Sequence, residues 1–383
     1  MAMGFELEMH RRITDSNADN LPGDTRLVEH PWFRLVSDKV TIGGQQISNL
    51  EFVTEHFDQY TVSAVAAQNA LDDRIRALRS TRDLLYGATG RLDALLANHA
   101  PENMAIQFVK NGGTAIAGPC PGVDDNRLLV HYSVGFPPSQ WRQMLGGIHT
   151  VIRDDSARNR AKTHLTNALA AADTLVHANA ATINNAAAGT ELRGHIALLY
   201  MHAAVWVDRT LNLALRDVRK ERPINQNKID NVDNQQPYGT KVPKNKIAAL
   251  PRAMLCELHE LLSDPAKQFL ADEKEAVLNA IATKLEQQHG LDLPEGYVLE
   301  SDEHGEASLG DFLGAGFGSN NEYSQQILFG GMKEVGIDRA QMARPVIPFE
   351  IRQIYASRVT WDEFSQQAAR VLAWSRNPGA NAL

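Results

Sequence analysis

Residues 4–13 of the chain read GFELEMHRRI, and this stretch decides how the fold begins. Apolar and polar side chains alternate along it: Phe5 and Leu7 fall on one side, whereas Glu6 and Glu8 fall on the other. Successive side chains of a strand point to opposite faces, so the alternation predicts a β-strand with one buried face. We expect the acidic residues to line the other face.

Similar reasoning along the rest of the chain predicts strands near both ends and helices between them. The region at about 154–219 is rich in Ala and Leu and reads as two helices separated at Gly189–Thr190. The expected strands lie at 26–38 (one strand or a strand pair), 50–57, 105–110, 128–136 and 344–354, and the stretch at 40–47 predicts a hairpin around Gly43–Gly44. The other expected helices lie within 63–99, after Pro138, after Pro251, from Ser263 toward His289, and after Thr360.

Strands at both ends with helices between them favour an α+β fold over regular βαβ alternation. No clear linker divides the sequence, so we expect a single domain over residues 1–383. Its helical section at about 154–219 would be a large insertion. The polar stretch at about 220–246 contains few apolar residues and predicts a long loop, which we expect to be mobile and to close over a site.

Composition excludes several classes of protein. The chain has 383 residues, 43% of them hydrophobic and 22% charged, which allows a sizeable buried core. Its formal net charge of −8 argues against a nucleic-acid partner, because neutralising phosphates needs a basic surface. The two cysteines, Cys120 and Cys256, are not in a metal-type spacing. We expect no membrane span, no signal peptide and a cytoplasmic location.

Polar groups recur on the expected strands. Carboxylates gathered on one sheet face would repel one another, and a bound divalent cation relieves that cost. Oxygen ligands favour magnesium or manganese over zinc, and such ions usually also hold substrate phosphates. The residues that would gather if the strands share a sheet are Glu6, Glu8, Glu51, His131, Ser133, Glu350 and Arg352.

Five segments, in this order, resemble the amidoligase family, carboxylate–amine ligases of the glutamine-synthetase superfamily. They span nearly the whole chain, and none is specific by itself. The segments are GFELE at 4–8, NLEFVTEHF at 49–57, VHYSVGF at 130–136, KNKIAALPRAML at 244–255 and PFEIRQI at 348–354.

The resemblance implies a glutamine-synthetase-like antiparallel sheet with a concave active-site face, packed with helices. It implies an ATP-dependent ligase that uses Mg²⁺ or Mn²⁺ and forms an amide or isopeptide bond through an acyl-phosphate. Its substrates would be a small-molecule or peptide carboxylate and an amine, and a homo-oligomer is compatible with the superfamily. The implied metal ligands are Glu6, Glu8, Glu51 and Glu350; His131, Ser133, Arg252 and Arg352 would bind nucleotide, and the two arginines would stabilise the transferring phosphoryl group.

Alternatives remain open at this level. Glutamine synthetases have two histidines in the third strand, and Leu129 stands where the first would be. His131 is equally well explained as a core histidine, and Glu6 and Glu8 as the solvated side of an amphipathic strand. A phosphotransferase of the guanidino-kinase type would use the same residues, and a non-catalytic binding protein would keep only the fold.

Overall fold

The computed structural model describes most of both ends of the chain and the helical middle. Arg252, Arg352 and the predicted loop at 220–246 lie outside the described residues, which are 2–42, 44–58, 62–120, 127–218, 249–251, 253, 255–289, 298–301, 305–308, 310, 313–318, 346–351 and 358–380.

The chain forms two compact units, each built from two separate stretches. One comprises Met1–Gly135 and Tyr355–Asn377, and the other comprises Phe136–Ile354 and Pro378–Leu383. The predicted helical section belongs entirely to the second unit. Neither unit is a continuous segment of the chain, so the sequence has no single boundary between them. The expectation of one catalytic domain stays a prediction.

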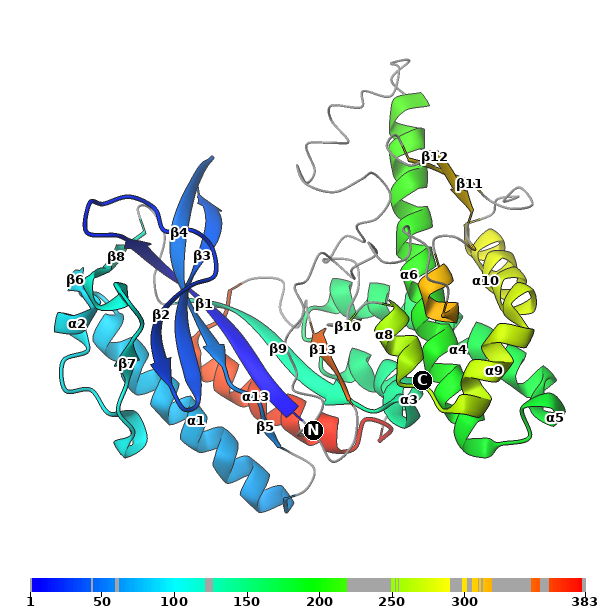
Figure 1. Ribbon diagram of the computed structural model, residues 1–383, viewed down its shortest axis with the longest axis horizontal. Coiled ribbons are helices and arrows are strands. Elements are labelled where there is room, and N and C mark those ends of the chain that lie inside the picture. The colour runs from blue at the N-terminus through cyan, green and yellow to red at the C-terminus, as the bar shows by residue number, and fades with distance from the viewer. Residues whose placement is uncertain are drawn as a thin grey trace. The chain divides into compact units, whose positions relative to one another are not determined.

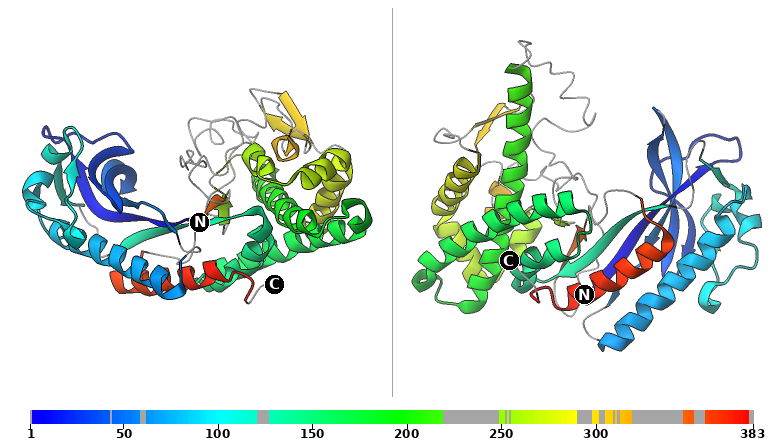
Figure 2. Two further views of the ribbon diagram at one scale, coloured as in Figure 1. Left: turned by 60° about the horizontal axis from the view of Figure 1, so that its bottom comes forward. Right: turned by 180° about the vertical axis from the view of Figure 1, so that it is seen from behind.

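A curled antiparallel sheet is the centre of the first unit, with β1 in its middle (Figures 1 and 2). Within this unit its hydrogen-bonded order runs β9-β1-β4-β3-β2-β7, and β1 also pairs with β5 and β8, whereas β10 and β13 pair with each other in the second unit. Three of the acidic strands of the sequence analysis, β1, β4 and β9, are therefore members of one sheet. The strands are β1 (Ala2–Thr14), β2 (Thr25–His30), β3 (Phe33–Ile42), β4 (Gln45–Thr54), β5 (Phe57–Asp58), β6 (Gly90–Arg91), β7 (Gln107–Phe108), β8 (Ile116–Pro119), β9 (Leu128–Phe136), β10 (Ala249–Pro251) and β13 (Ile347–Ile351).

The β3–β4 hairpin confirms the turn predicted around the glycine pair. Ile42 is paired with Gln45, and Gly44 has a φ of +81°, a conformation that glycine adopts without steric cost. On the other side of β4, the register with β1 shifts between Glu8 and Arg12. Such a bulge leaves ladder groups without their usual partners. Here the side-chain oxygen of Asn49 accepts a hydrogen bond from the Arg11 amide at 3.1 Å.

Helices α1 and α13 lie side by side along the first unit (Figure 2). The Phe364 ring of α13 meets the Phe5 ring of β1 edge-on at 5.4 Å, and both side chains are buried. Ser63 caps α1, and Thr360 forms a capping box with Glu363 at the start of α13. The elements are α1 (Ala64–Leu85), α2 (Leu92–Leu95) and α13 (Trp361–Arg376), with 3₁₀ turns η1 (Pro101–Asn103) and η2 (Gly112–Thr114).

The second unit is mainly helical. Helix α6 packs against α3 and α4, and Trp141 of α3 is fully buried. None of the helices in the described part of the chain is long and apolar enough to cross a membrane. The elements are α3 (Pro138–Gly147), η3 (Ile148–Thr150), α4 (Asp155–Ala178), α5 (Ala180–Ile183), α6 (Ala186–Val218), α8 (Leu255–Glu260), α9 (Asp264–Asp272), α10 (Lys274–His289), η5 (Gly314–Phe317), β11 (Val298–Ser301) and β12 (Gly305–Ser308).

The predicted helix break at Gly189–Thr190 is wrong, because both residues lie inside α6. The chain turns instead at Asn184, which caps α5 in the left-handed region at φ 40°. The Asn185 side chain then accepts hydrogen bonds from the amides of Ala187 and Ala188 at 3.0 Å, which starts the next helix. Asparagine side chains and backbone, rather than the glycine, therefore make this break.

The α+β expectation is confirmed in its general form: an antiparallel sheet combined with helices. A specifically glutamine-synthetase-like arrangement remains a proposal.

Candidate metal site on the face of the sheet

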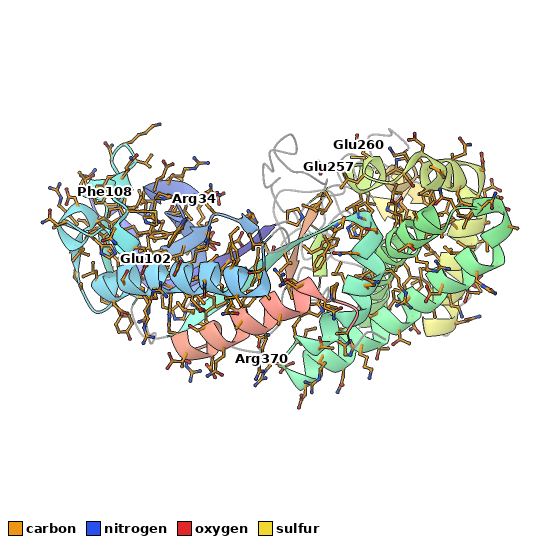
Figure 3. All side chains as sticks on the ribbon, turned by 90° about the horizontal axis from the view of Figure 1, so that it is seen from below. Arg34, Glu102, Phe108, Glu257, Glu260 and Arg370 are labelled. Carbon is orange, nitrogen blue, oxygen red and sulfur yellow. The ribbon has the colours of Figure 1, made fainter. Side chains whose placement is uncertain are left out.

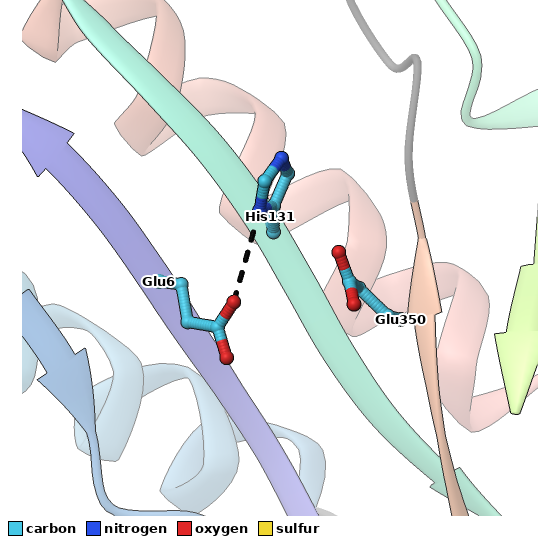
Figure 4. Close-up of side chains that lie close together, drawn as sticks. All are labelled: Glu6, His131 and Glu350. Carbon is cyan, nitrogen blue, oxygen red and sulfur yellow. Dashed lines mark ion pairs between the residues drawn. The ribbon is translucent and has the colours of Figure 1, made fainter. Parts of the chain in front are cut away.

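The strand pair β1–β9 places Glu6 directly opposite His131. The two side chains point toward each other, with 3.7 Å between Nδ1 of His131 and Oε2 of Glu6 (Figure 4). Both are about one-sixth exposed, at 14% for His131 and 18% for Glu6. An imidazole and a carboxylate this close, and still within reach of water, can bind a cation together.

The alternation of β1 explains why this pair is accessible. The side chains of Phe5 and Leu7 point to the opposite face and are almost completely buried, Phe5 against Phe364. Burying a side chain of this size contributes about 1.5–3 kcal/mol, so the apolar residues decide which face turns inward. Glu6 and Glu8 are thereby held on the polar face.

Glu350 of β13, the metal ligand predicted from the last strand, belongs to the second unit, where its side chain is fully buried. Metal binding by Glu350 therefore stays a prediction. The structure of the first unit brings together two of the predicted site residues, Glu6 and His131.

The other predicted ligands occupy the same face at different positions. Glu8 lies opposite Glu51, which is buried. Neither of them is the strand partner of His131, which lies opposite Glu6. Ser133 is buried opposite Gly4, two residues along β9 from His131. Metal binding by Glu8 and Glu51 and nucleotide binding by Ser133 stay predictions.

Arg252 and Arg352 were predicted to bind the phosphoryl group, and both fall outside the described residues.

Asp38 of β3 is a site residue that the sequence analysis missed. Its partner across the β3–β4 ladder is Asn49, two residues from Glu51, which puts it on the same face of the sheet. Burial raises the pKa of the Asp38 carboxyl and a backbone hydrogen bond lowers it; the charges of Asp24 and Glu6 add to the rise, and that of His131 opposes it. Asp38 is the single acid of residues 36–40, and nothing in the sequence marked it as close to Glu6.

Arg358 is the second residue that sequence reasoning missed. It precedes α13 and reaches β1, where Nη1 donates to the Glu8 carbonyl at 3.2 Å and Nη2 lies 3.8 Å from the Glu8 carboxylate. Burial lowers the pKa of this guanidinium, and the charges of Glu8 and Cys120 oppose the shift. The residue sits outside any periodic segment, so no local pattern could have identified it.

Both cysteines are free thiols in this structure. Burial raises the pKa of the Cys256 thiol, and the charges of Glu257 and Glu260 add to the shift. These two glutamates lie on α8 in the second unit (Figure 3). A thiol held in its protonated form is a poor nucleophile, so these surroundings do not activate Cys256.

Comparison with known proteins yields no relative. A scan against family models finds no match, and searches of the curated proteins and of the solved structures find none either. The resemblance to amidoligases therefore depends on the five sequence segments alone.

Proposed function

We propose that this protein is an ATP-dependent carboxylate–amine ligase of the amidoligase type, with a divalent metal held on the polar face of its sheet. The observation that carries the proposal is the Glu6–His131 pair on neighbouring strands of the first unit. These residues come from two of the five segments that resemble the family. A glutamine-synthetase-like fold and cytoplasmic location belong to the same proposal.

Oxygen ligands fit Mg²⁺ or Mn²⁺, and Glu6 and His131 are the residues of the first unit that would hold the ion. When bound, such an ion draws charge off a transferring phosphoryl group. Glu6 and His131 are held on ordered strands, so the site would need little rearrangement to bind it. The buried face behind them gives that rigidity.

The proposed reaction has two steps. An oxygen of the substrate carboxylate attacks the terminal phosphorus of ATP, ADP leaves, and an acyl-phosphate forms. The amine nitrogen then attacks the acyl carbon, inorganic phosphate leaves, and the nitrogen loses a proton to solvent or to a carboxylate of the site. The acyl-phosphate must be shielded from water until the amine attacks it.

An isotope experiment tests this function directly. Purified protein is incubated with ATP, Mn²⁺ or Mg²⁺, a set of amines and acids whose carboxylates carry ¹⁸O, and the released phosphate is analysed by mass spectrometry. A ligase transfers one ¹⁸O to phosphate, whereas a guanidino-type phosphotransferase releases none and yields a phosphorylated product. Absence of metal-dependent ATP binding, measured by calorimetry, would instead favour the non-catalytic alternative.

Matched variants decide whether the proposed site is responsible. Glu6→Gln and His131→Asn should abolish phosphate release. The control is Glu55→Gln, which alters an exposed acid near the end of β4 whose carboxylate lies 3.8 Å from the Arg34 guanidinium. This variant should leave phosphate release unchanged. Unchanged turnover in both site variants would overturn the assignment.

A further inference from the structure

Arg358 and Glu8 form a unit on the polar face of the sheet. The guanidinium contacts Glu8 twice, at the backbone oxygen and at the carboxylate, from a segment about 350 positions later in the chain. Both side chains are mostly buried, with 18% of Arg358 and 13% of Glu8 exposed. Burying a charged pair is costly unless the geometry is good, so the contact calls for an explanation.

Holding the chain in place does not explain it. The residue after Arg358 already forms a two-hydrogen-bond bridge with β9: the amides of Leu128 and Val359 each donate to the other residue's carbonyl at 2.8 Å. The entry to α13 is fixed separately by the capping box of Thr360 and Glu363. The segment would stay attached to the sheet without the guanidinium.

The position of Glu8 places the Arg358–Glu8 pair on the face that carries Glu6 and His131. Glu8 and Glu6 lie two residues apart on β1, so their side chains emerge on the same face as His131. A guanidinium carries five N–H groups in a rigid plane, and the two contacts with Glu8 use only part of them. The planar donor arrangement matches the oxygens of a phosphoryl group or a carboxylate.

We propose that Arg358 binds the oxyanion of the ligand that shares the Glu6–His131 metal, and that Glu8 positions Arg358 rather than binding the metal. The assignment rests on the proposed function, because it presupposes a metal at Glu6 and His131. It places a cationic side chain, that of Arg358, on the polar face of the sheet. It also gives Glu8 a role that differs from the metal binding predicted for it. The ligand class is an anion with terminal phosphoryl or carboxylate oxygens.

Calorimetry with three probes tests the proposal: MnCl₂ alone, Mn²⁺ with the non-hydrolysable analogue AMP-PNP, and acetate in the presence of Mn²⁺. Arg358→Ala should leave the Kd for Mn²⁺ within about twofold and weaken an oxyanion probe about 10- to 100-fold, the usual value of a hydrogen bond to a charged group. Loss for AMP-PNP alone identifies a phosphoryl partner, and loss for acetate alone identifies a carboxylate partner. Equal affinities of wild type and variant for both oxyanion probes would overturn the assignment.

Two further variants separate a binding role from a structural one. Arg358→Lys keeps the charge but not the planar donor set, and should recover only part of the oxyanion affinity. Glu8→Gln should weaken oxyanion binding and spare Mn²⁺; a Glu8→Gln protein that loses Mn²⁺ instead shows that Glu8 is a metal ligand. Arg142→Ala removes a half-buried arginine that contacts Asp173 at 2.8 Å in the second unit, and should change neither affinity.

The two proposals fail in different ways. If wild-type protein binds no Mn²⁺, the metal site itself is wrong. If wild-type protein binds Mn²⁺ and an oxyanion probe, but Arg358→Ala binds AMP-PNP and acetate as well as wild type does, only the role of Arg358 is wrong. Circular dichroism on each variant checks that the protein is folded before the affinities are compared.

Discussion

Two regions of this protein hold histidines in opposite environments. His131 lies on the sheet of the first unit, partly exposed and 3.7 Å from the carboxylate of Glu6. His195 and His202 lie on α6 of the second unit and are completely buried. Nε2 of His195 is 2.7 Å from the Gly316 carbonyl, so this nitrogen carries the proton.

The difference shows that the surroundings of an imidazole decide what it can do. Burial lowers the pKa of His195 to about 4 and that of His202 to about 3, so both rings are neutral packing groups at pH 7. His131 has a carboxylate beside it and a path to water, which are the conditions for cation binding. The predictions below test this contrast, starting with the largest effect.

Acid should destabilise the second unit through its buried histidines. The folded-state pKa of His195, about 4, lies below the unfolded value of 6.5. The unfolded chain therefore binds more protons between these values, so stability is complete above pH 6.5 and falls as the pH drops toward 4. The loss from His195 alone is on the order of 3 kcal/mol. Urea unfolding of wild type and His195→Gln at pH 7.5, 6 and 5 should show a weaker pH dependence in the variant.

That result depends on the location of the histidine. His131→Asn, measured in the same way, should keep the wild-type pH dependence of α6 stability. Hydrogen exchange of the α6 amides separates the second unit from the first. If His195→Gln shows the full wild-type acid sensitivity, the buried ring is not its source.

Metal affinity should depend on the sheet histidine and not on exposed ones. His131→Asn and Glu6→Gln should weaken Mn²⁺ binding about 100-fold or more, because even the partners of ligands typically contribute 10- to 100-fold. His177→Asn, at an exposed position at the end of α4, should bind Mn²⁺ like wild type. Manganese EPR titration provides the measurement. If all three variants bind Mn²⁺ equally well, Glu6 and His131 contribute no more to metal binding than an exposed histidine does.

Close packing around α6 should make two glycines of the same helix respond in opposite directions. A Cβ at Gly194 would lie 2.6 Å from Cβ of Trp141 and 2.9 Å from the backbone nitrogen of Arg142. Gly194→Ala should therefore cost about 1–3 kcal/mol through overpacking. A Cβ at Gly189 would meet its nearest atoms at 3.6 Å, so Gly189→Ala should gain up to about 1 kcal/mol of helix propensity. Thermal unfolding of both variants gives the comparison.

The smallest effect is expected at the capping box of α13 in the first unit. The Thr360 hydroxyl accepts a hydrogen bond from the Glu363 amide at 3.3 Å, and the Glu363 carboxylate accepts one from the Thr360 amide at 2.8 Å. Thr360→Ala should cost about 1 kcal/mol, and Thr360→Ser should cost much less. Chemical unfolding monitored in the first unit should detect the loss, while His195 titration in the second unit stays unchanged.

Much of the secondary structure was predictable because it is encoded locally. The alternation at Phe5, Glu6, Leu7 and Glu8 gave β1 and its two faces, and the apolar run at 128–136 gave β9 with the bounds that the structure has. The helix break was misplaced because Gly189 is tolerated inside α6, whereas Asn184 and Asn185 supply the left-handed turn and the cap. Local conformational preference alone did not distinguish these positions.

The candidate site was predictable only in part. Glu6 and His131 could be named from their strands, but their closeness depends on which strands are neighbours and in which register. Asp38 reaches the same face through β4, and Arg358 reaches Glu8 from a segment with no periodic pattern. Pairing between residues so far apart in the sequence cannot be identified from the residues that surround each partner.

The sequence by itself determined which side chains of β1 would be buried and which would face the other way, because strand geometry turns alternation into two faces. It also determined an acidic, metal-compatible set of residues near both ends of the chain. Only the tertiary structure decided that Glu6 meets His131, that Glu8 meets Arg358, and that the histidines of α6 are sealed from water. Those outcomes follow from strand register and helix packing, which arise from contacts between distant segments rather than from the preferences of neighbouring residues.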